Sequence, residues 1–160
     1  MSHKNNKNIN VQIKSATQFL KKGEVVAAQE IFNKITDLPS DDDVATLVQL
    51  GSLASQLGEH VAAINIYTKL VEKHPDNTSY LDSFGMACIH SWMNLQAETL
   101  FKKALEINPD MHNPYMQLGY IEISRRQFIE AVESLEKALK LKPSEPVIYI
   151  NLVIALMRLT

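Results

Sequence analysis

Apolar residues recur along most of the chain at spacings of three and four, which is the spacing of one face of an α-helix. Three stretches combine this pattern with a final proline, which cannot continue a helix: IYTKLVEKHP, LFKKALEINP and LEKALKLKP. The three prolines, Pro75, Pro109 and Pro143, follow one another at intervals of 34 residues. The pattern therefore predicts helices that end at a fixed interval, which indicates an internal repeat.

The same interval holds for small and bulky residues. If each proline is position 32 of a repeat, position 8 is always glycine, position 20 is always alanine and position 24 is always bulky. Small residues let two helices approach closely, and bulky residues fill the space between them. The residues concerned are Gly51, Gly85 and Gly119 at position 8, Ala63, Ala97 and Ala131 at position 20, and Tyr67, Phe101 and Leu135 at position 24.

This pattern resembles the tetratricopeptide repeat (TPR), a pair of antiparallel helices. The resemblance covers nearly the whole chain and implies an all-α fold, a right-handed superhelix (α-solenoid) of antiparallel helix pairs. We assign residues 1–8 to a flexible N-terminal tail and residues 9–160 to the TPR array. The repeats of this array are expected at 9–43, 44–77, 78–111 and 112–145, followed by a half repeat at 146–160.

The resemblance also implies that the first helices of the repeats line a concave groove that binds a peptide or partner protein. Carboxylate-clamp TPRs hold chaperone tails there with Lys, Arg and Asn, but the carried-over positions hold no basic residue and Asp82 has the wrong sign. Met86, Met116 and Tyr120 indicate either an adaptable apolar groove or packing between repeats, and both interpretations stay open. The expected groove residues are Val48, Gln49, Ser52, Ser55, Asp82, Met86, Ile89, Met116, Gln117, Tyr120 and Ile123.

Two residues depart from the repeat pattern. Trp92 stands at position 15, where Gly23 and Gly58 are expected to be turn residues. It is either an interface anchor or a side chain folded back onto Leu95, and we favour the second. Glu122 stands at position 11, which is usually aromatic or apolar, and nothing in the sequence explains it.

The last stretch, VIYINLVIALMRLT, is apolar on nearly every face, as in a helix that is buried on both sides. We consider two explanations: the chain is the N-terminal piece of a longer protein, or this surface mediates self-association. We prefer the first, with dimerisation through the exposed end as a consequence. The possible interface residues are Trp92, Tyr149, Ile150, Ile154 and Met157.

Composition narrows the class of protein. The 160 residues carry 16 basic and 18 acidic side chains, a net charge of -2, which argues against nucleic-acid binding through bulk charge. A single cysteine, Cys88, excludes an intramolecular disulfide and fits a reducing compartment. The first ten residues lack the apolar core of a signal peptide, and no apolar run is long enough to span a bilayer. We expect a cytoplasmic protein with no membrane insertion.

The sequence contains no motif for phosphate binding, metalloprotease or hydrolase chemistry. Its five histidines are not spaced as metal ligands with one another or with Cys88, which we interpret as a structural thiol. We therefore expect no metal, no cofactor and no enzyme activity, but a non-catalytic protein-interaction module. Alternatives are the regulatory or substrate-recruiting N-terminal region of a larger sulfotransferase- or glycosyltransferase-like enzyme, or a small secretion or assembly chaperone. RNA binding is the weakest hypothesis, because the expected groove lacks basic residues.

Overall fold

Helices form wherever apolar residues recur at spacings of three and four. The computed structural model describes residues 2–35, 39 and 43–159, with side chains from residue 8 onward, and these residues contain nine α-helices and no strand. The helices belong to two compact units, Met1–Pro75 (unit 1) and Asp76–Thr160 (unit 2). The prediction of an all-α fold is confirmed.

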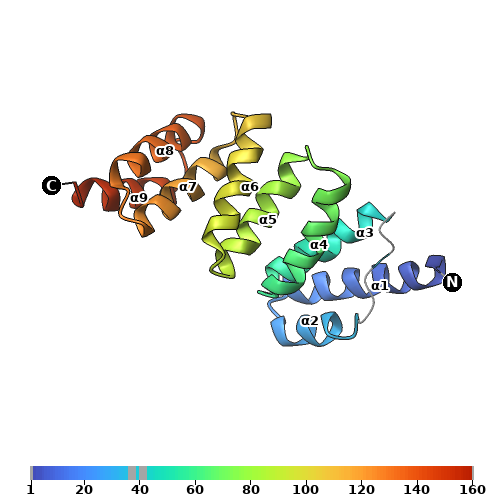
Figure 1. Ribbon diagram of the computed structural model, residues 1–160. Coiled ribbons are helices and arrows are strands. Elements are labelled where there is room, and N and C mark those ends of the chain that lie inside the picture. The colour runs from blue at the N-terminus through green and yellow to red at the C-terminus, as the bar shows by residue number, and fades with distance from the viewer. Residues whose placement is uncertain (1, 36–38, 40–42, 160) are drawn as a thin grey trace. The chain divides into compact units, whose positions relative to one another are not determined.

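Unit 1 contains four helices: α1 (Ser2–Lys21), α2 (Val25–Phe32), α3 (Val44–Gln56) and α4 (His60–Lys73). The helices pack as two pairs, α1 with α2 and α3 with α4, and α1 also packs against α3 (Figure 1). The seam between α1 and α3 therefore joins the two pairs of this unit.

Unit 2 contains five helices: α5 (Thr78–His90), α6 (Asn94–Ile107), α7 (His112–Ser124), α8 (Phe128–Leu141) and α9 (Pro146–Met157). Here α5 pairs with α6 and α7 with α8, while α6 also contacts α7. The last helix, α9, packs against both α7 and α8. Each helix of this unit thus lies against its neighbours in the chain.

The first helix is longer than we predicted. It begins at Ser2, so residues 2–8 are helical where we expected a flexible tail, and residue 1 lies outside the described part. The stretch SHKNNKN contains neither glycine nor proline, so nothing in it stops a helix that the apolar spacing of Ile9, Ile13 and Ala16 establishes.

The glycines at position 8 lie where the two helices of a pair approach most closely. Each of them faces the bulky side chain of position 24 in the second helix. A Cβ atom would lie 3.1 Å from the Tyr67 ring at Gly51, 2.5 Å from the Phe101 ring at Gly85, and 2.5 Å from Leu135 Cγ at Gly119.

The turns within the helix pairs share one backbone conformation. Position 15 is left-handed in all four, with φ of 77° at Gly23 and Gly58, 60° at Trp92 and 63° at Arg126. Glycine adopts this conformation without strain, whereas a side chain makes it costly by about 1 kcal/mol. Trp92 and Arg126 are thus strained, and Trp92 lies in the turn between α5 and α6.

None of the helices that the structure describes has both the length and the apolar character needed to span a lipid bilayer.

Candidate functional site

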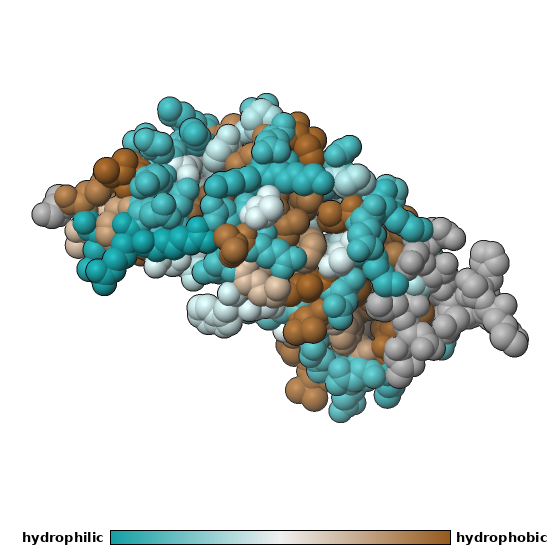
Figure 2. Space-filling model, viewed as in Figure 1, coloured by the Kyte–Doolittle hydropathy of each residue, from teal (hydrophilic) through white to brown (hydrophobic). Residues whose placement is uncertain are grey.

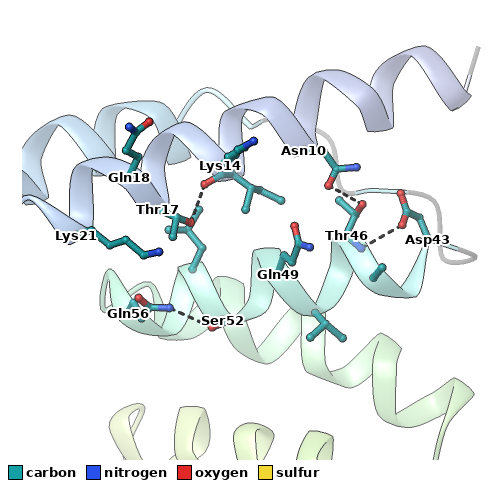
Figure 3. Close-up of a pocket in the computed structure, with 14 residues that line it drawn as sticks. Asn10, Lys14, Thr17, Gln18, Lys21, Asp43, Thr46, Gln49, Ser52 and Gln56 are labelled. Atoms are coloured by element: carbon teal, nitrogen blue, oxygen red, sulfur yellow. Dashed lines mark hydrogen bonds between the residues drawn. The ribbon is translucent and has the colours of Figure 1, made fainter.

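Unit 1 contains a pocket of about 1120 Å³ between α1 and α3. From α1, its lining includes Asn10, Lys14, Thr17, Gln18 and Lys21. From α3 and the residue before it, the lining includes Asp43, Thr46, Val48, Gln49, Ser52 and Gln56. Figure 3 shows Lys21 and Gln49 pointing into the space between the two helices. Most of the lining residues are thus polar, and they come from the first helices of the first two repeats.

One end of the pocket is fixed by hydrogen bonds. The buried Thr46 hydroxyl donates to Asn10 Oδ1 at 2.9 Å, which ties α3 to α1 (Figure 3). The Thr46 backbone N–H donates to Asp43 Oδ1 at 3.1 Å, so Asp43 caps the N-terminus of α3. The carboxylate of the pocket is therefore already engaged by the positive end of a helix.

The cations of the pocket are available to a ligand. Lys14 and Lys21 are exposed, and neither forms an ion pair or hydrogen bond with another described residue. They are seven residues apart on α1, two helical turns or about 10 Å along the axis. The side-chain amides of Gln18 and Gln49 are likewise without a partner among the described residues. The pocket therefore offers two positive charges and several hydrogen-bond donors.

Three of the 14 residues that line this pocket are among the expected groove residues. These are Val48, Gln49 and Ser52, whereas Ser55 lies outside the lining and its hydroxyl donates to the Gly51 carbonyl at 3.0 Å. The α1 residues were missed because groove positions were carried over only from the second repeat onward. The groove positions carried over to α3 hold no basic residue, but α1 adds two lysines to the lining of the pocket. The register of the first repeat placed Lys14 at the same position as Gln49, and this signal could have found it.

In unit 2, one expected groove residue is a carboxylate, Asp82, that a neighbouring helix holds by hydrogen bonds. Asn113 of α7 donates its amide to both oxygens of Asp82 on α5, at 2.8 and 3.0 Å. Burial raises the pKa of Asp82, while the Asn113 hydrogen bond and the charge of His112 lower it. Gln117 reaches Asn113 Oδ1 at 3.5 Å, so these three side chains are brought together. Lysine and arginine are absent from this group.

The apolar residues that were expected in the groove differ in how exposed they are. Met116 is 9% exposed and belongs to a core cluster with Leu135 and Ile148, so its assignment to the groove is corrected to packing. The reason is that α9 covers this position of α7. Ile123 packs against the same cluster. The other three are more accessible: Met86 and Ile89 are half-buried, and Tyr120 is exposed.

The possible interface residues are accessible in the structure. Trp92 is 84% exposed and Leu95 is 74% exposed, so the hypothesis that Trp92 folds back onto Leu95 is wrong. The four possible interface residues of α9 are also exposed, namely Tyr149, Ile150, Ile154 and Met157.

The surroundings of Glu122 disfavour the ionised form of its carboxyl group. Its side chain is half-buried, burial raises the pKa of its carboxyl, and a hydrogen bond with Ser134 only partly offsets this shift. Its Oε2 atom has no hydrogen-bond partner among the described residues. The carboxylate therefore destabilises the packing between α7 and α8 when it is ionised.

Cys88 is the single cysteine of the chain. Cys88 is fully buried, and burial raises the pKa of its thiol to about 11, so the reactive thiolate is scarce at neutral pH. No group of three or more His, Cys, Asp or Glu side chains within the described part of the chain could hold a metal ion.

The sequence profile of the tetratricopeptide repeat matches residues 44–77 and 112–145. The small glutamine-rich tetratricopeptide repeat-containing protein 2 of Mycosarcoma maydis is 31% identical over 113 residues. That match covers 69% of this chain and 32% of the relative, so the chain spans about a third of the length of the curated relative.

Solved structures of similar fold cover most of the chain. A crystal structure of MamA protein matches with a TM-score of 0.75 and 21% identity, over 94% of this chain and 81% of that one. The first TPR domain of Spaghetti (RPAP3), bound to the HSP90 peptide SRMEEVD, matches with a TM-score of 0.69 and 21% identity. This second match covers 75% of this chain and 95% of that one. The α-solenoid fold class is confirmed by these matches.

Proposed function

Because the chain belongs to the tetratricopeptide repeat family, we propose that it is a non-catalytic protein-interaction module that holds an extended segment of a partner protein. The segment lies in the pocket between α1 and α3. The observation that carries this proposal is the set of polar side chains without partners that line this pocket.

The dimensions of the pocket suit a short extended peptide. From Asn10 to Lys21 the groove-facing side of α1 extends about 17 Å. An extended chain rises about 3.3 Å per residue, so five or six residues span this length. The Gln18 and Gln49 amides can hydrogen-bond the backbone of such a segment, whose own N–H and C=O groups need partners.

The charges of the pocket favour an acidic segment. Lys14 and Lys21 both line it, whereas Asp43, its acidic residue, is engaged in capping α3. In an extended peptide with the polyproline II twist, carboxylates three residues apart lie on one face and about 9 Å apart, close to the spacing of the two lysines along α1. We therefore infer a partner segment with two acidic groups at this spacing.

The Spaghetti domain was solved with a peptide of this class. The peptide in that structure, SRMEEVD, has three acidic residues, and its first glutamate and final aspartate are three residues apart. The similarity to that domain, at 21% identity, concerns the fold. The acidic ligand is inferred for this chain from its own lysines.

Fluorescence anisotropy tests the proposal with labelled SRMEEVD and with SRMQQVN, in which amides replace the three acidic side chains. We expect the acidic peptide to bind at least about tenfold more tightly, with an affinity that falls as salt is added. Reversing the charge of Lys14 and Lys21 together (Lys14→Glu, Lys21→Glu) should weaken binding by roughly a hundredfold.

Lys34→Glu is the matched control, because Lys34 is an exposed lysine of the same unit that does not line the pocket. It should leave the affinity within about twofold of wild type. Equal binding of both peptides would refute the acidic ligand. An equal loss of affinity in the control would refute the pocket as the binding site.

A further inference from the structure

The last helix, α9, is anchored on one side only. Ile148 and Ala155 are fully buried against Met116 and Leu135, and Leu152 packs against the same cluster. Among the described helices, α9 packs against α7 and α8. The buried side chains fall on one face of α9, so its opposite face is left open.

The open face of α9 is apolar and carries no charge. Six of its side chains are 41–58% exposed: Val147, Tyr149, Ile150, Val153, Ile154 and Leu156. Figure 2 shows apolar side chains gathered at the α9 end of unit 2. With ordinary side-chain areas these residues present roughly 500 Å² of apolar surface, more than half of the about 800 Å² per partner in a stable interface. Such a surface is typical of a protein contact.

Val153, in the middle of the open face, limits how closely a partner helix can approach. Val153 lies 34 residues after Gly119, in the series of close-approach glycines at position 8. At the three glycines, a Cβ atom would lie within 2.5 to 3.1 Å of a bulky side chain of the second helix. A β-branched valine therefore excludes a helix that docks on α9 as α4 docks on α3, or α6 on α5.

A helix can still dock on α9 at the wider spacing at which apolar side chains of both helices interdigitate. A second copy of α9 offers the required surface, because it is apolar, free of charge and equally large. In a two-fold symmetric contact, a residue at the axis meets its own copy, and Val153 lies at the centre of the open face. We propose that α9 packs against α9 of a second copy of this chain, centred on Val153, and forms a homodimer.

Analytical ultracentrifugation from low to high micromolar concentration tests this proposal. The measured mass of the wild-type protein should rise with concentration from 18.0 kDa to twice this value. Val153→Glu and Ile150→Glu should each weaken the dimer by roughly a hundredfold or more, since they place like charges in an apolar contact. Circular dichroism should show unchanged helix content, because both side chains are more than half exposed.

Val61→Glu is the control, because Val61 is 71% exposed on α4 in unit 1 and should leave the dimer intact. In a second measurement, a bifunctional thiol reagent should link two copies of a Val153→Cys variant, while the buried Cys88 stays unmodified. A wild-type monomer at all concentrations would overturn the proposal and assign the face to a different partner. A dimer that both glutamate variants leave intact would also overturn it.

Discussion

The glycines at position 8 predict a graded response to a single methyl group. In Gly85→Ala the added Cβ would lie 2.5, 2.7 and 3.0 Å from three carbons of the Phe101 ring. Carbon atoms in contact prefer about 3.5 to 4.0 Å, so the overlap approaches 1 Å. Phe101 is fully buried and its ring is rigid, so the helices must separate. In Gly51→Ala the closest contact is 3.1 Å, to the Tyr67 ring, and a small displacement relieves it.

The two effects of the substitution have opposite signs. Alanine is the better helix former by about 1 kcal/mol, whereas overpacking costs about 1–3 kcal/mol. For Gly51→Ala the two nearly cancel, and the free energy of unfolding should stay within about 0.5 kcal/mol of wild type. For Gly85→Ala overpacking dominates, with a net loss of about 1–2 kcal/mol.

Urea denaturation followed by far-ultraviolet circular dichroism measures these differences. The double variant Gly85→Ala, Phe101→Leu is the control for the mechanism, because a smaller side chain makes room for the methyl group. The double variant should lose less free energy of unfolding than the sum of the losses of Gly85→Ala and Phe101→Leu, by about 1 kcal/mol. A Gly85→Ala variant as stable as wild type would refute overpacking against Phe101. A larger destabilisation of Gly51→Ala than of Gly85→Ala would refute it too.

Three further predictions concern strain, charge and the pocket. Trp92→Gly and Arg126→Gly should each raise the free energy of unfolding by about 1 kcal/mol, because glycine relieves the left-handed backbone; a lower urea midpoint would contradict this. Burial raises the pKa of Glu122 above 4.5, so its contribution to stability is present below that value and is lost as pH rises through the folded-state pKa. Glu122→Gln should therefore be more stable than wild type at neutral pH, and equal urea midpoints there would refute the cost of this carboxylate. Thr46→Val removes the hydroxyl that bonds Asn10 and should cost about 1 kcal/mol, with faster amide exchange in α1 by mass spectrometry; unchanged exchange would show that this bond does not hold the helix.

The repeat interval predicted the features that depend on spacing alone. Gly51, Gly85 and Gly119 contact bulky side chains of the second helices, as small residues at a close approach should. The turn position of Trp92 was predicted in the same way. Periodicity predicts which positions meet within a repeat, because helix geometry is the same in each copy.

Features that depend on a particular neighbour were predicted less well. Met116 occupies a groove position in the repeat pattern, but α9 packs over it and places it in the core. Whether Trp92 folds onto Leu95 depends on a side-chain rotamer, which spacing does not determine. Lys14 and Lys21 were missed because groove positions were carried over only from the second repeat onward, although these lysines line the pocket.

The Asn10–Thr46 hydrogen bond also bears on the order in which unit 1 folds. It joins residues 36 apart in the chain, whereas the helices of each pair are close in sequence. Contacts between distant residues carry a larger loop-closure cost, so the pairs α1–α2 and α3–α4 should form first and dock afterwards. The pocket would then be the last part of unit 1 to form and the first to open. A ligand held there would slow the unfolding rate of the whole unit.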